Sequence, residues 1–125
     1  MPIKTDIVII DSGISEENVE GISFIENDGG IVQSFDLTDV IGHGTGIYHI
    51  IKRHSRDSSV FFIKICDKKN QKPSINILIH ALEYVNKNID CKIINMSLSI
   101  SFGSYGHSLK ALSSICKELY KKTLF

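Results

Sequence analysis

The sequence lacks tryptophan, has only two prolines and carries no net charge, because 14 Lys and Arg balance 14 Asp and Glu over its 125 residues. Balanced charge argues against a nucleic-acid-binding domain, which normally presents a basic face to the phosphates. No apolar run approaches the ~20 residues that a membrane-spanning helix needs. We therefore expect neither a nucleic acid nor a membrane among the partners of this chain.

Cysteine is also scarce, and the three cysteines Cys66, Cys91 and Cys116 stand far apart in the sequence. They do not form the closely spaced pairs typical of zinc sites, and their odd number does not suit a disulfide framework. An apolar run already begins at Ile7, too close to Met1 to leave room for a signal peptide. We therefore expect reduced thiols, no metal, no cofactor and a cytoplasmic location.

What the chain does contain is an alternation of two kinds of apolar segment. Runs rich in β-branched residues predict buried strands of a parallel sheet at 6–10, 60–66 and 91–98. Helical spacing predicts helices over 45–54, from 75 onward with Ser74 as the N-cap, and from 108 onward. Asn-Asp-Gly-Gly at 27–30 predicts a hairpin on the surface. The alternation indicates one α/β domain over 1–125, a three-layer parallel sheet.

The faces that these helices bury follow from the spacing of their apolar residues. The first helix is expected to bury Ile47, Ile50 and Ile51. The second is expected to bury Ile75, Leu78, Leu82 and Val85, and the third Leu109, Leu112, Cys116 and Leu119. Residues 123–125 are expected to start one more strand.

Two polar residues stand where the backbone is expected to turn sharply. Asp11 ends the first apolar strand, and a buried carboxylate there needs a hydrogen bond or a charge partner. His43 lies between Gly42 and Gly44, which suggests backbone that passes close to a neighbouring segment. On these residues alone, Asp11 is equally well a turn aspartate that caps its own backbone, and His43 a residue at a helix start. Ligands bind at the carboxyl ends of strands in open α/β sheets, so Asp11 is expected at that edge.

These segments resemble the motifs of the subtilisin-like serine proteases, the subtilases. Val-Ile-Ile-Asp-Ser-Gly-Ile at 8–14 is similar to the catalytic-aspartate motif of the family. Gly-His-Gly-Thr at 42–45 resembles the catalytic-histidine motif, with Asp39 at the acidic position that often precedes it. Ile-Ile-Asn-Met-Ser-Leu-Ser at 93–99 resembles the strand whose backbone pairs with bound peptide. The three ordered motifs span nearly the whole chain and match the N-terminal half of a family catalytic domain.

The resemblance implies a subtilisin-type three-layer fold and hydrolysis of peptide bonds. Asp11 and His43 would be the catalytic residues, with Asp11 orienting His43 as general base toward a serine. Ser97, Leu98 and Ser99 would bind an extended peptide or protein substrate along a strand edge. Ser99 replaces the usual glycine there, which would narrow the adjacent specificity pocket.

The family's oxyanion-hole asparagine and its Gly-Thr-Ser nucleophile segment have no counterpart in the 125 residues. Ser104 aligns with a loop before a helix, not with the nucleophile. We therefore expect a truncated domain, inactive alone, that a complementary C-terminal half would complete. The alternative is a non-catalytic peptide-binding module derived from a subtilase. A phospho-acceptor or nucleotide domain with Asp11 at its switch point is a third interpretation, although it lacks the paired acidic residues or glycine loop expected there.

Overall fold

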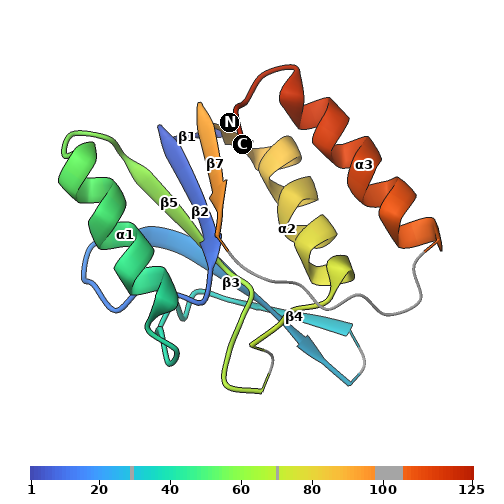
Figure 1. Cartoon of the computed structure of the whole chain (residues 1–125), viewed down its shortest axis with the longest axis horizontal. Helices are drawn as coiled ribbons and strands as arrows, with labels where there is room; N and C mark the ends of the chain where they lie inside the picture. Colours follow the sequence, from blue (N-terminus) through green and yellow to red (C-terminus); the bar gives the residue numbers. More distant parts are fainter. Residues whose placement is uncertain (29, 70, 98–105) are drawn as a thin grey trace.

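The computed structural model describes residues 1–28, 30–69, 71–97 and 106–125, with the side chains of 106–108 excepted. Its main sheet has the strand order β4-β3-β5-β2-β7 (Figure 1). The bounds of these strands are β2 (Ile7–Asp11), β3 (Glu20–Asn27), β4 (Gly30–Ser34), β5 (Val60–Lys64) and β7 (Ile93–Met96). The helices are α1 (His43–His54), α2 (Ile75–Asn88) and α3 (Gly106–Tyr120). A second, two-stranded parallel sheet joins β1 (Ile3–Lys4) to β6 (Ile89–Asp90).

The strands β3, β5, β2 and β7 run parallel, and β4 runs antiparallel to β3 at the edge of the sheet. The predicted hairpin is present, with Asn27 paired to Gly30. It is more than a surface feature, however, because its first strand pairs with β5 inside the main sheet. The predicted α/β class is therefore confirmed, because the described residues form three helices and a sheet that is mixed and mostly parallel.

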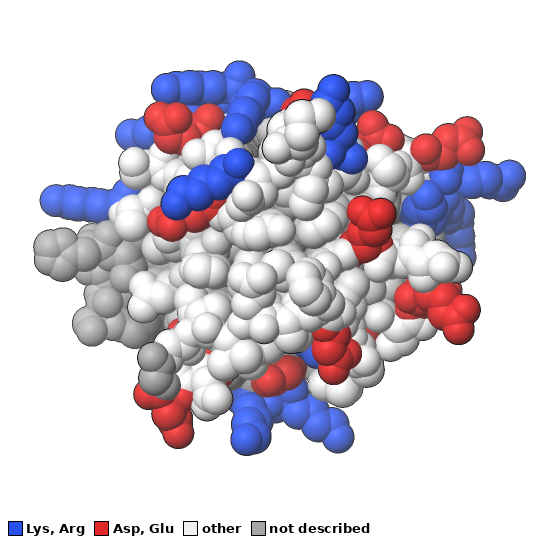
Figure 2. All heavy atoms as spheres, turned by 180° about the vertical axis from the view of Figure 1, so that it is seen from behind, with Lys and Arg blue, Asp and Glu red and all other residues white. Residues whose placement is uncertain are grey.

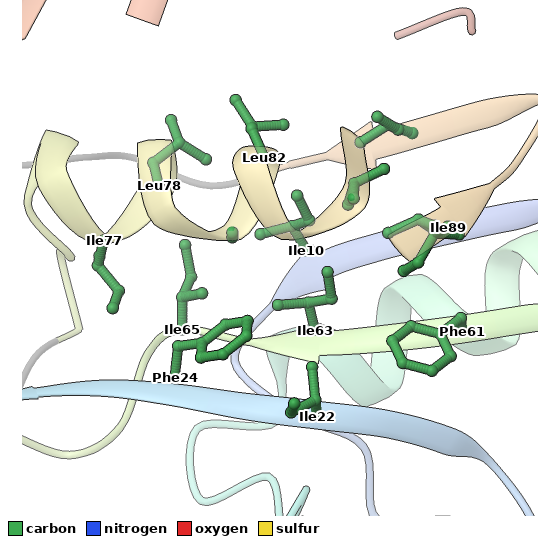
Figure 3. Packing of buried hydrophobic residues seen from close by; sticks show 14 of the residues in the cluster. Ile10, Ile22, Phe24, Phe61, Ile63, Ile65, Ile77, Leu78, Leu82 and Ile89 are labelled. Carbon is green, nitrogen blue, oxygen red and sulfur yellow. The ribbon is translucent and has the colours of Figure 1, made fainter. Parts of the chain in front are cut away.

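The larger core lies between the sheet and α2. Val8 and Ile10 of β2 are fully buried, as is Ile63 of β5. Leu78 and Leu82 of the predicted stripe of α2 belong to the same cluster, but Figure 3 shows their side chains pointing away from the strands and Ile77 pointing toward them. Ser74 caps α2 as expected, since its hydroxyl accepts a hydrogen bond from the N–H of Ile77. The unbroken apolar run of β2 follows from this geometry, because all five of its residues are buried between two layers.

The opposite face of the sheet carries a smaller core under α1. Ile7 and Ile9 of β2 pack there with Ile47 and Ile51 of α1. Figure 1 shows α1 on one side of the sheet and α2 with α3 on the other. Ile50 was predicted to be buried on α1, and that prediction is wrong because 55% of its surface is exposed. The buried stripe of α1 is narrower than the spacing of its isoleucines indicates.

The last helix, α3, packs mainly against α2. Leu119 is fully buried as predicted, and Leu112 and Cys116 are partly buried. Leu109 is 47% exposed, so its predicted burial is wrong, while Ile115 joins the core instead. The expected strand near the end of the chain is present as one parallel bridge between Leu124 and Ile93.

Charges of both signs lie on the face of the molecule opposite to the view of Figure 1. Figure 2 shows one face with a broad uncharged centre and with acidic and basic side chains interleaved around its rim. On this face neither sign gathers into a patch. Within the described part of the chain, no helix combines the length and apolar character needed to cross a membrane.

Two crossover connections, on opposite faces of the sheet, make the C-terminal end of β2 the point where the chain connections diverge. The chain first builds β3 and β5 on one side of β2, with α1 leading into β5. It then returns through α2 to add β7 on the other side of β2. Connections that diverge in this way leave a crevice at the carboxyl end of the strand between them. Asp11, the last residue of β2, lies at that point.

Candidate active site

Asp11 faces α1 because side chains alternate along β2. Ile7 and Ile9 pack under α1, so the next residue of the same parity, Asp11, lies on that face too. Its side chain is only 1% exposed. One carboxylate oxygen, Oδ1, accepts hydrogen bonds from the Ser12 N–H at 2.7 Å and from His43 Nδ1 at 2.8 Å. Within the described residues the buried Oδ2 has no partner, so the charge of Asp11 is compensated through Oδ1 alone.

His43 meets Asp11 because it is the first residue of α1. Gly42 precedes it with φ of 96°, a conformation that residues with a side chain rarely adopt. Gly44 follows it so close to the turn after β2 that an added Cβ would lie 2.2 Å from the carbonyl oxygen of Gly13. Glycine is therefore favoured on the two sides of His43 for different reasons, the positive φ at Gly42 and the close contact with the turn at Gly44. The imidazole itself is 49% exposed, which leaves its second nitrogen accessible.

Asp39 lies beside this pair and binds the same two segments. Its carboxylate accepts hydrogen bonds from the hydroxyl of Ser12, which follows β2, and from the backbone N–H and hydroxyl of Thr45 in α1. Partial burial raises the pKa of Asp39, but hydrogen bonds from Thr45, Gly42 and Ser12 outweigh it and lower the pKa from 3.8 to about 2. Asp39 is therefore ionised throughout the physiological range.

A cavity of about 510 Å³ opens next to the pair. Its lining comes from the ends of β2 and β7, the start of α1 and the segment after β5, namely Asp11, Ser12, Ile41, His43, Cys66, Gln71, Lys72 and Ser97. Ser97 lines the cavity because Ile10 pairs with Met96, and this pairing places the next residues, Asp11 and Ser97, side by side. The other two predicted substrate-binding residues, Leu98 and Ser99, lie outside the described residues, as does Ser104.

The sequence did not single out Cys66 as a cavity residue. It follows β5 next to the end of β2, and only its place in the sheet reveals the proximity. Burial raises the pKa of the Cys66 thiol to about 12, and the nearby negative charges of Asp11, Asp67 and Asp39 act in the same direction. The thiol therefore stays protonated at neutral pH and is a poor nucleophile.

Both serine hydroxyls that line the cavity are engaged elsewhere. Ser12 Oγ donates to Asp39 and accepts from the N–H of Gly44. Ser97 Oγ donates to Oδ1 of Asn95 at 3.0 Å. Within the described residues, no hydroxyl is hydrogen-bonded to Nε2 of His43. The arrangement can therefore hold a neutral imidazole with Nδ1–H on Asp11 and present Nε2 as a base to a hydroxyl brought from another segment or molecule.

No family model, curated protein or solved structure matches this chain. Across the described residues there is no group of three or more His, Cys, Asp or Glu side chains arranged to hold a metal ion. The chemistry that the site can support is acid–base chemistry by the Asp11–His43 pair.

Proposed function

We propose that these residues form the Asp–His half of a subtilisin-like serine protease. One observation carries the proposal, the 2.8 Å contact between Nδ1 of His43 and the buried Oδ1 of Asp11. Support also comes from the order of the three motifs and from the position of Asp11 at the crevice of the sheet. The proposed reaction is hydrolysis of a peptide bond, with a serine supplied by a segment outside residues 1–125.

In this proposal His43 acts as the general base. Its Nδ1–H donates to Asp11, which fixes the tautomer and leaves the Nε2 lone pair free to take the proton of a serine hydroxyl. The imidazolium that forms is then stabilised by the buried carboxylate of Asp11. The protonated His43 returns the proton to the leaving amine. Ser97, with Leu98 and Ser99, would line the path of an extended substrate.

The proposal predicts that a serine-directed fluorophosphonate does not label the 125-residue chain. The matched measurement uses a longer product of the same gene, found by reading the coding DNA past Phe125 in all frames for a Gly-Thr-Ser segment. That product should be labelled, and labelling should fall by at least ~10³-fold in His43→Ala, because the hydroxyl loses its base. His54→Ala, at an exposed position at the end of α1, serves as the control and should label normally. Labelling of the 125-residue chain itself would contradict the proposal.

A non-catalytic peptide-binding module is the second candidate. It is favoured by the outer edge of β7, which pairs with no described segment beyond the single bridge to Leu124. The N–H of Ile94 bonds to the carbonyl of Leu124, away from β2, and alternation places the N–H of Met96 on the same outer side. An extended peptide could add there as a further strand. This candidate predicts peptide binding that survives His43→Ala and is weakened by Met96→Pro, with Met96→Leu as the control. Hydrolysis of the bound peptide would count against it.

A further inference from the structure

We propose that Asp39 is a positioning residue, whose carboxylate fixes the start of α1 against the end of β2 and thereby holds His43 on Asp11. The catalytic role of the Asp11–His43 pair rests on the proposed function above. The relative positions of Asp11 and His43, and the effect of Asp39 on these positions, do not depend on that function.

The first observation is that Asp39 caps α1 from a distance. The residue at the cap position is Gly42, which has no side chain to accept a hydrogen bond from the first turn. The carboxylate of Asp39 does this instead. Its Oδ2 accepts from the N–H of Thr45 at 2.9 Å and from the Thr45 hydroxyl at 2.6 Å, and its Oδ1 accepts from the N–H of Gly42 at 2.8 Å. The backbone on both sides of His43 is thus held by one side chain.

The second observation is that the same carboxylate reaches the strand that carries Asp11. Oδ1 of Asp39 accepts from the Ser12 hydroxyl at 2.9 Å, and that hydroxyl accepts in turn from the N–H of Gly44 at 2.9 Å. The N–H of Ser12 donates to Oδ1 of Asp11 at 2.7 Å. Ser12 follows Asp11 in the chain and Gly44 follows His43, so one hydroxyl and one carboxylate join the immediate neighbours of both partners.

The third observation is that this role needs a carboxylate and not merely a polar side chain. With the N–H of Ile41 at 3.1 Å, Asp39 accepts five hydrogen bonds on its two oxygens. An asparagine has one acceptor oxygen, and its NH₂ would face either the donors of Thr45 or those of Ser12 and Gly42. On one side of position 39, the N–H groups of the asparagine would then face N–H and O–H groups that also donate. The start of α1 must shift or lose its contact with Ser12, and the imidazole of His43 moves with it.

The test compares Asp39→Asn with a matched control, Asp36→Asn, in the free 125-residue chain. Asp36 lies in the same loop and also accepts a backbone N–H and a hydroxyl, both from Thr38. Within the described part of the chain, its carboxylate accepts no hydrogen bond from α1. The readout is the tautomer of neutral His43, measured from the ¹⁵N shifts of its ring, with thermal melts to confirm folding. We expect Asp39→Asn to lower the ratio of Nδ1–H to Nε2–H by roughly fivefold, the scale of one lost hydrogen bond. Asp36→Asn should leave the ratio unchanged.

Two further variants keep the test decisive. Asp39→Glu retains the carboxylate and should recover part of the ratio that Asp39→Asn loses. If Asp39→Asn does not fold, Ser12→Ala cuts only the link between Asp39 and Gly44, and it should lower the ratio in the same direction. A folded Asp39→Asn or Ser12→Ala protein with the native ratio would overturn the positioning role. Because the readout needs no proteolysis, failure of the labelling experiment above would refute the protease proposal and leave this result standing.

Discussion

Two glycines in the first turn of α1 have opposite surroundings. A Cβ added to Gly44 would lie 2.2 Å from the carbonyl oxygen of Gly13 and 2.8 Å from Cζ of Phe62, whereas one added to Gly46 meets nothing within 4 Å. We predict that Gly44→Ala destabilises the fold by about 1–3 kcal/mol, because the helix must move off the turn. Gly46→Ala should stabilise it by about 0.5–1 kcal/mol through helix propensity. Urea unfolding of both variants measures the contrast, and equal effects would show that α1 does not start against the turn.

The carboxylate of Asp39 makes stability depend on pH at the acidic end. Its pKa is lowered in the folded state, so its contribution is fully present above the unfolded pKa near 3.8 and is lost as pH falls toward about 2. Because Asp39 is only partly buried, screening reduces this contribution to about 1 kcal/mol. Urea midpoints of the native chain and of Asp39→Asn, measured between about pH 4 and pH 2, should converge as pH falls. A constant gap between the two curves would contradict the assignment.

At the residue scale, the sequence predicts some residues of the candidate active site and does not predict the others. Alternation along an apolar strand predicts which face of the sheet carries Asp11. The glycines on either side of His43 indicate that its backbone lies close to another segment. The role of Ser12 and the position of Cys66 depend on which strands become neighbours, and no local pattern carries that information. Asp39 stood out only through the resemblance, because a carboxylate that caps a helix three residues before the cap position has no simple spacing rule.

The three helices differ in how much of each is buried, and this explains which apolar residues the periodicity placed correctly. α2 is covered by the sheet on one side and by α3 on another, so its whole predicted stripe is buried. α1 rests on one face of the sheet with only partly buried side chains beyond Gly44. Helical spacing reports which residues share a face and not how wide the covered part of that face is. The two-residue strands β1 and β6 were missed because they are too short to show any period.

This difference predicts unequal effects of truncating apolar residues in the two helices. Leu82 of α2 is fully buried, whereas Ile50 of α1 is 55% exposed. Leu82→Ala should destabilise the fold by about 2–5 kcal/mol through lost burial and a cavity. Ile50→Ala should change stability by no more than about 0.5 kcal/mol. Chemical denaturation of both variants tests the comparison, and a large loss of stability in Ile50→Ala would contradict the exposed position of Ile50 on α1.

At the scale of the whole molecule, both outer strands of the main sheet carry exposed apolar residues. At the β4 edge, Val32 is 51% and Phe35 is 79% exposed. Beside β7, Ile93 is 41% and Leu124 is 65% exposed. Edge strands with apolar side chains offer both backbone hydrogen bonds and hydrophobic surface to another chain. We therefore expect the 125-residue chain to associate with itself as its concentration rises.

The β4 edge allows the sharpest test of this expectation, because four of its five residues are exposed. Val32→Lys removes apolar surface worth about 1.5 kcal/mol and adds a charge on the edge, so it should raise the concentration needed for association about tenfold. Ser114→Lys, at an exposed position on α3, adds the same charge elsewhere and serves as the control. Sedimentation velocity over a concentration series measures both. If Ser114→Lys has the same effect, net charge and not the β4 edge governs association, and a native chain that stays monomeric with a cooperative melt contradicts the expectation itself.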